Sequence, residues 1–481
     1  MALDFLTDRD VWLKAFIAAE WAVRIGMLIV VPFRRTPDAA KGWLLLIFFE
    51  PTVGLALYLL IGRPRLPALR RERSEEFIAN AEPVYRRLAR SPAIYHPEPG
   101  PELAPAVRLA EALGDMPILG GNAIEVLAAY DDIVDRLVAD IDAAQRNVHL
   151  LFYIFADDAV SARVVDALAR AVKRGVACRV LADSMGSRPA FRKMLPRFAA
   201  AGIAAAETLP VGFLRRHTAR LDLRNHRKIA VFDGRIGWTG SLNIVDPTFK
   251  PGLTYEELMV RVTGPVVLEL QAVFVADWFI ETGELIGDAE TVPEPVITGD
   301  VAAQVLPSSP AFPHENTQRL IVALIHAARK RVVITTPYFI PDAALLQALS
   351  TAVLRGVDVR LVVPAQDDQI LVCLAQKSYY AELLSSGVRI CRYGKRFLHA
   401  KHATIDGEVA WIGSSNMDIR SFVLNAEVTL LAYDNRVCAL LQAEQERYFR
   451  DGEWLDATAW GHAPLARQVA WNLARLLSPL L

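Results

Sequence analysis

The pattern H-x-K-x-x-x-x-D occurs twice in this 481-residue chain, and each copy is followed by the pattern Gly-Ser-x-Asn. The second pattern begins seven residues beyond the aspartate in both cases. One copy in a long chain would be weak evidence, whereas two copies with the same trailing pattern are strong evidence of a shared function. We expect one composite active site built from His226, Lys228, Asp233, Ser241 and Asn243 of the first copy and His399, Lys401, Asp406, Ser414 and Asn416 of the second.

These side chains suit attack on a phosphodiester. Such an ester is anionic, so its cleavage needs donors around the nonbridging oxygens, a nucleophile, and an acid for the leaving alkoxide. A neutral imidazole from one copy could attack phosphorus while the imidazolium of the other protonates the leaving oxygen. The lysines and asparagines could donate hydrogen bonds to the phosphoryl oxygens, and the serines could shape the same pocket. No cofactor or metal ion is expected, because the spacing of His399 and His402 lacks the further ligands of known zinc patterns.

Each histidine also needs a partner on its second ring nitrogen to fix its tautomer and orientation. Glu427 and Glu257 are the candidates because they follow the two Gly-Ser-x-Asn patterns in comparable stretches, and Glu256 could substitute for Glu257. Asp233 and Asp406 complete the catalytic motif. Each precedes a glycine in an Asp-Gly turn, which favours turn geometry or ion pairing near the site over proton transfer.

The elements that must position these motifs are duplicated as well. The sequence of residues 141–157 matches that of residues 325–342, and both stretches have the pattern of a helix end, a buried strand and a loop. A helical pattern then ends at Gly175 in the first half and at Gly356 in the second, and an apolar strand follows each glycine. The repeat predicts two duplicated α/β domains.

At these motifs the chain resembles the phospholipase D superfamily and, within it, the bacterial cardiolipin synthases. The resemblance spans nearly the whole chain and is strongest at residues 152–155 (FYIF), 224–228 (RNHRK), 336–342 (TPYFIPD), 397–401 (FLHAK) and 413–427 (GSSNMDIRSFVLNAE). It departs from the family pattern at residues 304–310 and 255–257, away from the central motif residues. It implies an α/β fold with two tandem phospholipase D-like domains, 119–295 and 296–481, each a mixed sheet flanked by helices.

The resemblance also implies a function. A cardiolipin synthase is a phosphatidyltransferase that converts two phosphatidylglycerol molecules into cardiolipin and glycerol through a covalent phosphohistidine. By similarity His226 is the nucleophile and His399 the general acid that later acts as base, although the residues alone leave the two exchangeable. A lipid-hydrolysing phospholipase D, a nuclease and a noncatalytic scaffold are the alternatives. A formal charge of −1 counts against nucleic acid as a partner, the intact motifs count against a scaffold, and the oligomeric state is undetermined.

The first 65 residues are expected to be a membrane anchor at the bacterial inner membrane, because 53% of the chain is hydrophobic. Segment 42–62 is long enough to cross a hydrocarbon core of about 30 Å. Its interior Glu50 is either a functional or assembly residue or the sign of a kinked, partly immersed segment. Segment 11–33 is a weaker crossing candidate that could lie in the interface, and its Glu20 and Arg24 are spaced to pair along one helix.

Charges and composition suggest how the remaining segments are arranged. Basic residues after the second apolar segment place the catalytic domains in the cytoplasm, and no cleavable signal peptide is expected. The proline-rich stretch 66–118 reads as a connector. Residues 464–481 form an amphipathic helix that either rests on the membrane or covers an apolar patch. The four cysteines, Cys178, Cys373, Cys391 and Cys438, are expected to be buried thiols.

A cluster of arginines lies close in sequence to the first motif histidine. Such a cluster could hold anionic lipid head groups at the entrance of the site, and a solvated loop is the alternative. Its members are Arg215, Arg216, Arg220, Arg224 and Arg227.

Overall fold

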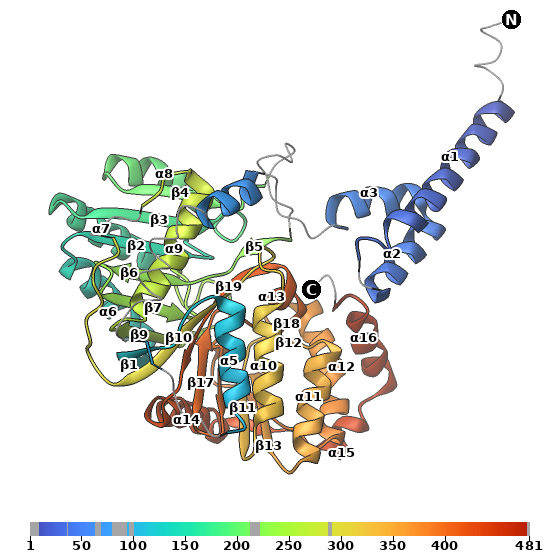
Figure 1. The fold of residues 1–481 in the computed structure, drawn as a ribbon. Coiled ribbons are helices and arrows are strands. Elements are labelled where there is room, and N and C mark those ends of the chain that lie inside the picture. Colours follow the sequence, from blue (N-terminus) through green and yellow to red (C-terminus); the bar gives the residue numbers. More distant parts are fainter. Residues whose placement is uncertain are drawn as a thin grey trace, which may run out of the picture. The chain divides into compact units, whose positions relative to one another are not determined.

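The structure is a computed structural model that describes residues 9–35, 37–62, 69–78, 94–95, 101–211, 222–286 and 291–478. The chain divides into two compact units. The first consists of residues 1–66 with residues 220–222, and the second of residues 67–219 with residues 223–481 (Figure 1).

The amino-terminal unit holds three helices, α1 (Arg9–Val30), α2 (Pro37–Phe49) and α3 (Pro51–Ile61). They pack through a small apolar cluster in which the rings of Trp43 and Tyr58 meet edge to face, 5.3 Å between centroids. Glu20 and Arg24 form the expected ion pair along α1, with N and O atoms 3.2 Å apart.

Of the alternatives for segment 42–62, the kink at Glu50 is confirmed, and no single helix runs through the segment. The helix breaks at Glu50, which has φ −133° and ψ 79° and precedes the first residue of α3. The physical reason is Pro51, which lacks an N–H group and disfavours helical geometry at the residue before it. Among the described residues, no helix combines the length and the apolar character needed to span a bilayer.

The second unit is built on one continuous sheet of sixteen strands. In its first half, β2, β3 and β4 are parallel, whereas β6, β7 and β9 run antiparallel beside them. The elements of this half are β1 (Leu119–Leu127), α6 (Tyr130–Ala143), β2 (Asn147–Phe152), α7 (Ala159–Lys173), β3 (Ala177–Asp183), α8 (Ala190–Ala200), β4 (Ala204–Thr208), β5 (Arg224–Asn225), β6 (Ile229–Phe232), β7 (Ile236–Gly240), β8 (Tyr255–Glu256), β9 (Met259–Thr263) and α9 (Val267–Thr282).

The second half repeats this order, with β11, β13 and β14 parallel and β16, β17 and β19 antiparallel beside them. Its elements are β10 (Val301–Ser308), α10 (Asn316–Ala327), β11 (Arg331–Thr335), β12 (Phe339–Ile340), α11 (Ala343–Leu354), β13 (Asp358–Pro364), α12 (Ile370–Ser385), β14 (Arg389–Tyr393), β15 (Phe397–Leu398), β16 (His402–Ile405), β17 (Val409–Gly413), β18 (Met417–Asp418), α13 (Ile419–Val423), β19 (Asn425–Ala432), α14 (Asn435–Arg450), β20 (Gly452–Trp454), α15 (Ala457–Gly461) and α16 (Leu465–Arg475).

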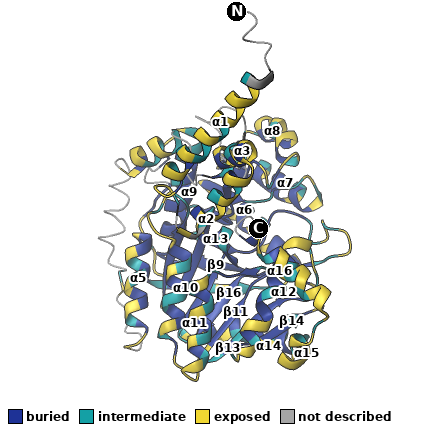
Figure 2. Ribbon diagram, turned by 90° about the vertical axis from the view of Figure 1, so that its right-hand side faces the viewer, coloured by how far each residue is buried: buried dark blue, intermediate teal, exposed yellow. Residues whose placement is uncertain are grey.

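The mixed sheet flanked by helices is confirmed in both halves, but the halves do not keep separate sheets. Strand β1 pairs with β9 and with β10, and β10 pairs with β19, so the two sheets merge. One apolar core under α9 and α14 therefore runs through both halves, and two further cores lie under α6, α7 and α8 and under α10, α11 and α12. Figure 2 shows the strands as the buried interior of this unit.

Several local expectations can be compared with these elements. Gly175 and Gly356 follow α7 and α11 with φ of +90° and +88°, as expected for glycines that end helices. All four cysteines are buried and free, which confirms that expectation. Within the stretch 66–118, residues 104–114 form α5, which packs on α10 and β10 as part of the second half's core.

Two short strands cross between the halves and position the motifs. Strand β5, just before His226, pairs in parallel with the start of β19, and His226 N donates to Ala426 O at 2.8 Å. Strand β15, just before His399, pairs in parallel with β8, and His399 N donates to Glu256 O at 2.8 Å. Each motif histidine is therefore held by the backbone of the opposite half.

Candidate active site

The two motifs line one cavity of about 360 Å³. His226 and Asn243 reach it from the first half, and His399 and Asn416 reach it from the second. Both histidines are buried, with exposed fractions of 8% and 6%. The cavity lies at the seam of the duplicated domains, where each copy supplies matching side chains.

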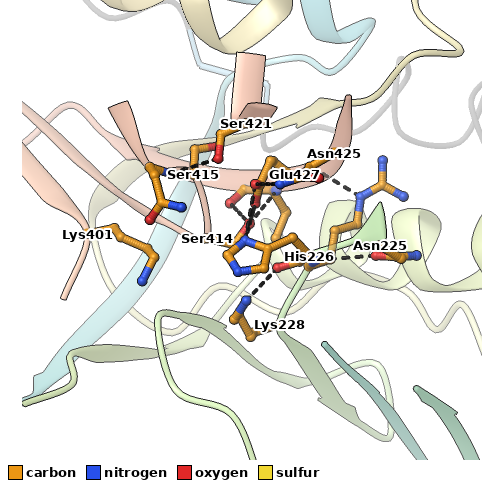
Figure 3. A network of polar contacts seen from close by, with 12 residues as sticks. Asn225, His226, Lys228, Lys401, Ser414, Ser415, Ser421, Asn425 and Glu427 are labelled. Atoms are coloured by element: carbon orange, nitrogen blue, oxygen red, sulfur yellow. Dashed lines mark hydrogen bonds and ion pairs between the residues drawn. The ribbon is translucent and has the colours of Figure 1, made fainter. Parts of the chain in front are cut away.

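Each histidine is paired with a glutamate of the opposite half. His226 Nδ1 lies 3.1 Å from both carboxylate oxygens of Glu427 (Figure 3). His399 Nδ1 lies 2.8 and 3.0 Å from the carboxylate oxygens of Glu257. Because a carboxylate accepts the proton on Nδ1, Nε2 of each ring keeps its lone pair for reaction. Neither half could form such a dyad alone.

The serines of the Gly-Ser-x-Asn patterns support these glutamates. Ser414 Oγ donates to Glu427 Oε2 at 2.5 Å, and Ser241 Oγ donates to Glu257 Oε2 at 2.5 Å. Each hydroxyl also accepts a backbone N–H, from Val428 at 3.0 Å and from Leu258 at 2.9 Å. The backbone contact leaves each hydroxyl proton for the carboxylate, so the serines act on the histidines through the glutamates.

Glu256 does not take the place of Glu257. Its carboxylate lies 2.6 Å from a guanidinium nitrogen of Arg447 and 3.5 Å from one of Arg396. Glu256 ends β8 and Glu257 follows it, and consecutive residues of an extended chain point to opposite faces. The carboxylate of Glu257 contacts the His399 ring, whereas Glu256 meets His399 through its backbone carbonyl.

Burial and charge set the protonation of the dyads. Burial lowers the pKa of His226 to about 4, although Glu427 opposes the change. Burial would raise the pKa of Glu427, but His226, Lys228 and the Ser414 hydroxyl lower it to about 2. Burial also lowers the pKa of His399. Near neutral pH the site therefore holds neutral imidazoles beside carboxylates, which is the state a nucleophilic histidine needs.

The two motif lysines are buried next to the histidines. Lys228 Nζ donates to His226 O at 2.7 Å, and Lys401 Nζ donates to His399 O at 2.5 Å. An ammonium group has three protons, so each lysine retains donors for a ligand. Burial lowers the pKa of Lys401 to about 8 and lowers that of Lys228 well below its ordinary value. An anionic ligand between them would favour their charged forms.

Asp233 and Asp406 lie in turns outside the set of described residues that line the cavity. Their φ angles are +54° and +55°. Each carboxylate accepts three consecutive backbone N–H groups, from residues 145–147 at 2.7 to 2.9 Å and from residues 329–331 at 2.7 to 2.8 Å. In each half, these hydrogen bonds fix the Asp-Gly turn of the motif to the residues at the start of the neighbouring strand, β2 for Asp233 and β11 for Asp406.

Of the five arginines in the cluster near His226, the structure describes Arg224 and Arg227. Arg224 lines the cavity, and its Nη1 donates to the buried Asp183 at 3.1 Å. Arg227 instead binds Asp277 and the carbonyl of Glu427, so its interpretation as an entrance residue is wrong. Arg227 lies two residues beyond β5, and its contacts with Asp277 and Glu427 hold it away from the cavity lining. Arg215, Arg216 and Arg220 lie outside the described residues.

Sequence reasoning missed the aromatic residues of the site. The Tyr153 ring meets the His226 ring at 4.9 Å between centroids, and Tyr255 meets His399 at 5.2 Å, both edge to face. Tyr338 and Asp368 also line the cavity. The repeat holds one usable signal, because Tyr153 and Tyr338 occupy matching positions of its two copies. Tyr255 and Asp368 have no such counterpart in the motifs.

Comparisons with known proteins agree with this architecture. The family model described as cardiolipin synthase, PLD-like domain, matches residues 137–278 and 321–449. Cardiolipin synthase A of Yersinia pestis bv. Antiqua (strain Angola) is 35% identical over 480 residues, covering 98% of each chain. The same values hold for cardiolipin synthase A of Yersinia pseudotuberculosis serotype O:3 (strain YPIII).

A solved structure shares the fold. The crystal structure of phosphatidylserine synthase from Haemophilus influenzae Rd KW20 matches with a TM-score of 0.61 at 16% identity, covering 78% of this chain and 100% of that one. The family model covers more than half of the chain, and the Yersinia relatives match it almost from end to end. The chain therefore belongs to the cardiolipin synthase family of phospholipase D-like phosphatidyltransferases.

Proposed function

We propose that this enzyme transfers a phosphatidyl group from one phosphatidylglycerol to another, giving cardiolipin and glycerol. The observation that carries the proposal is the pair of crossed His–Glu dyads on one cavity. When two imidazoles lie on opposite sides of one phosphorus, one can act as the nucleophile and the other as the general acid. Both the bond broken and the bond formed are phosphodiester bonds, so the exchange needs no ATP.

In the first step His226 Nε2 attacks phosphorus and forms a phosphatidyl-histidine, while the bond from phosphorus to the glycerol oxygen breaks. His399 gives its Nε2 proton to that oxygen, and glycerol leaves. His399 must be protonated for this step, although burial lowers its pKa. The negative charge of the bound phosphodiester opposes that effect and favours the imidazolium.

In the second step neutral His399 takes a proton from the head-group hydroxyl of another phosphatidylglycerol. The resulting oxygen attacks phosphorus, and the bond to His226 breaks. Lys228, Lys401, Asn243 and Asn416 donate hydrogen bonds to the nonbridging oxygens as charge builds on them. The two dyads have matching geometry, so the family resemblance is what assigns the nucleophile to His226.

Membrane association fits the exposed apolar side chains of each unit. Helix α1 exposes Trp12 and Trp21, with exposed fractions of 57% and 53%. Helix α16 buries Ala474 but exposes Leu465 and Leu473, at 76% and 60%. Such faces are suited to the boundary between head groups and acyl chains. We infer that the protein works at the cytoplasmic face of a bacterial inner membrane, where its lipid substrates lie.

The test is product analysis with detergent-solubilised protein and radiolabelled phosphatidylglycerol. Wild type should produce cardiolipin and free glycerol, and His226→Ala should produce neither. The control is His314→Ala, which changes an exposed histidine outside the described cavity lining and should retain activity. Phosphatidic acid as the sole lipid product of wild type would contradict the transferase proposal and establish a hydrolase.

A further inference from the structure

Asp368 is a buried carboxylate on the cavity that the proposed reaction does not use. It follows β13, and 1% of its side chain is exposed. The same cavity is lined by both motif histidines. Its neighbour Asp367 behaves like an ordinary surface residue, with 42% of its side chain exposed and an ion pair to Lys377.

The two oxygens of Asp368 have different surroundings. Oδ2 accepts hydrogen bonds from Tyr338 Oη at 2.6 Å, from Lys250 Nζ at 2.8 Å and from Tyr255 Oη at 3.0 Å. Oδ1 is buried and has no hydrogen-bond partner among the described residues. An unsatisfied buried carboxylate oxygen is costly, so a ligand with a hydroxyl donor would be stabilised there.

Asp368 stands next to the proposed general acid and base. Tyr255 links them, because its hydroxyl donates to Asp368 while its ring lies against the ring of His399. The carboxylate near the other histidine differs. Asp183 receives Arg224 and two backbone N–H groups on Oδ1 and a third backbone N–H group on Oδ2. Both oxygens of Asp183 are therefore occupied, and Asp183 is not among the described residues that line the cavity, whereas Asp368 is.

We propose that Asp368 Oδ1 accepts a hydrogen bond from the secondary hydroxyl of the glycerol group that exchanges at phosphorus beside His399. This assignment rests on the proposed function. The incoming alcohol must attack opposite His226, in the position that the leaving glycerol vacated, so one subsite serves both groups. Asp368 is then a specificity-determining residue that favours a vicinal diol over a simple alcohol or water. A site that accepts a hydrogen bond from a substrate hydroxyl discriminates against alcohols that lack this hydroxyl.

The Asp368→Asn variant tests the assignment with little change in shape. Three donors converge on the Oδ2 position, so the amide oxygen takes that place and the amide nitrogen takes the place of Oδ1. The oxygen that lacks a hydrogen-bond partner among the described residues is thereby replaced by a donor. The matched control is Asp367→Asn, the same chemical change one residue away at an exposed ion pair.

The experiment uses full-length protein with phosphatidylglycerol and an equimolar mixture of 1,2-propanediol and 1-propanol. The two alcohols differ by the vicinal hydroxyl, and their phosphatidyl products are resolved by mass. We expect wild type and Asp367→Asn to favour the diol, and Asp368→Asn to lose roughly tenfold or more of that preference, as expected when a hydrogen bond to a charged group is lost. Cardiolipin and phosphatidic acid are measured in parallel, and the fraction of cardiolipin should fall in Asp368→Asn.

Two results separate the possible failures. An unchanged ratio of diol to alcohol products in Asp368→Asn would overturn the role of Asp368, whatever the fate of cardiolipin. Absence of cardiolipin from the wild-type reaction would overturn the proposed function, while a diol preference that still depended on Asp368 would retain the subsite. Thermal unfolding of both variants shows that the comparison is made between folded proteins.

Discussion

Replacing Glu427 by glutamine should slow the enzyme by removing the charged partner of the nucleophile. Glu427 is fully buried, and its carboxylate lies 3.1 Å from His226 Nδ1 through either oxygen. Positive charge develops on this imidazole when Nε2 bonds to phosphorus, so the carboxylate stabilises the transition state more than the ground state. A hydrogen bond to a charged group contributes about 1.5–3 kcal/mol, which corresponds to a roughly 10- to 150-fold loss of kcat.

The serine contact explains why the glutamine cannot simply replace the carboxylate. Ser414 accepts the N–H of Val428 and donates to Oε2 of Glu427, so in the Glu427→Gln variant it would hold the new amide oxygen at that position. The amide nitrogen then faces the histidine from the Oε1 position, where it favours the tautomer with the proton on Nε2. That tautomer has no lone pair for phosphorus. Both effects reduce kcat.

The assay is the steady-state rate of cardiolipin formation at saturating phosphatidylglycerol. The control is Glu382→Gln, which removes an exposed carboxylate paired with Arg475. We expect the control to stay within about twofold of wild type, because exposed ion pairs contribute little. A Glu427→Gln enzyme within about threefold of wild type would refute the reasoning, as would an equal loss in the control.

Other predictions follow from the same contacts. Glu257→Gln should lower kcat roughly 10- to 150-fold through His399. Glu256→Gln should retain kcat within about threefold, because its side chain binds Arg447 and Arg396 and not the His399 ring. Equal losses in steady-state assays would contradict the assignment of the dyad. The specificity constant kcat/KM should fall as pH rises, first because His399 loses the proton that it must donate and then, through about 8, because Lys401 loses its charge; it should also fall as pH drops through about 4, because His226 becomes protonated. A pH profile that stayed flat from about pH 7 to 10 would refute the first limb. Asp233→Ala should destabilise the fold by about 1–3 kcal/mol, since three backbone N–H groups lose their acceptor. Chemical denaturation measures that loss, and a rate loss without any loss of stability would point to a direct catalytic role.

The duplicated pattern predicted much of the second unit because it fixes both the residue types and the spacing between them. The repeat was enough to place two α/β halves and the glycines that end α7 and α11. The merging of the two sheets was not predictable in this way. It depends on β1 and β10 pairing with each other, and these strands lie outside the repeated motifs.

Sequence reasoning found Glu257 and Glu427 but could not say which histidine each contacts. The answer depends on β5 and β15, two-residue strands that cross to the opposite half. Such strands are too short to leave a periodic pattern. The sequence also does not determine the direction in which a side chain points. Arg227 was therefore predicted to lie at the entrance, although it binds Asp277.

Hydropathy alone could not decide between a crossing segment and a kinked one at residues 42–62. Residues 42–62 have the hydropathy of a single segment, but Pro51 divides them into α2 and α3. Hydropathy averages over a window, whereas one proline acts at one residue.

Trapping the covalent intermediate tests the central claim most directly. Wild-type enzyme turning over phosphatidylglycerol radiolabelled at phosphorus is denatured within one turnover, digested and mapped. The account predicts an acid-labile label on the peptide that contains His226, with no such label in His226→Ala. Label on the peptide that contains His399 would reverse the two roles, and cardiolipin formation without any labelled histidine would contradict the phosphohistidine mechanism.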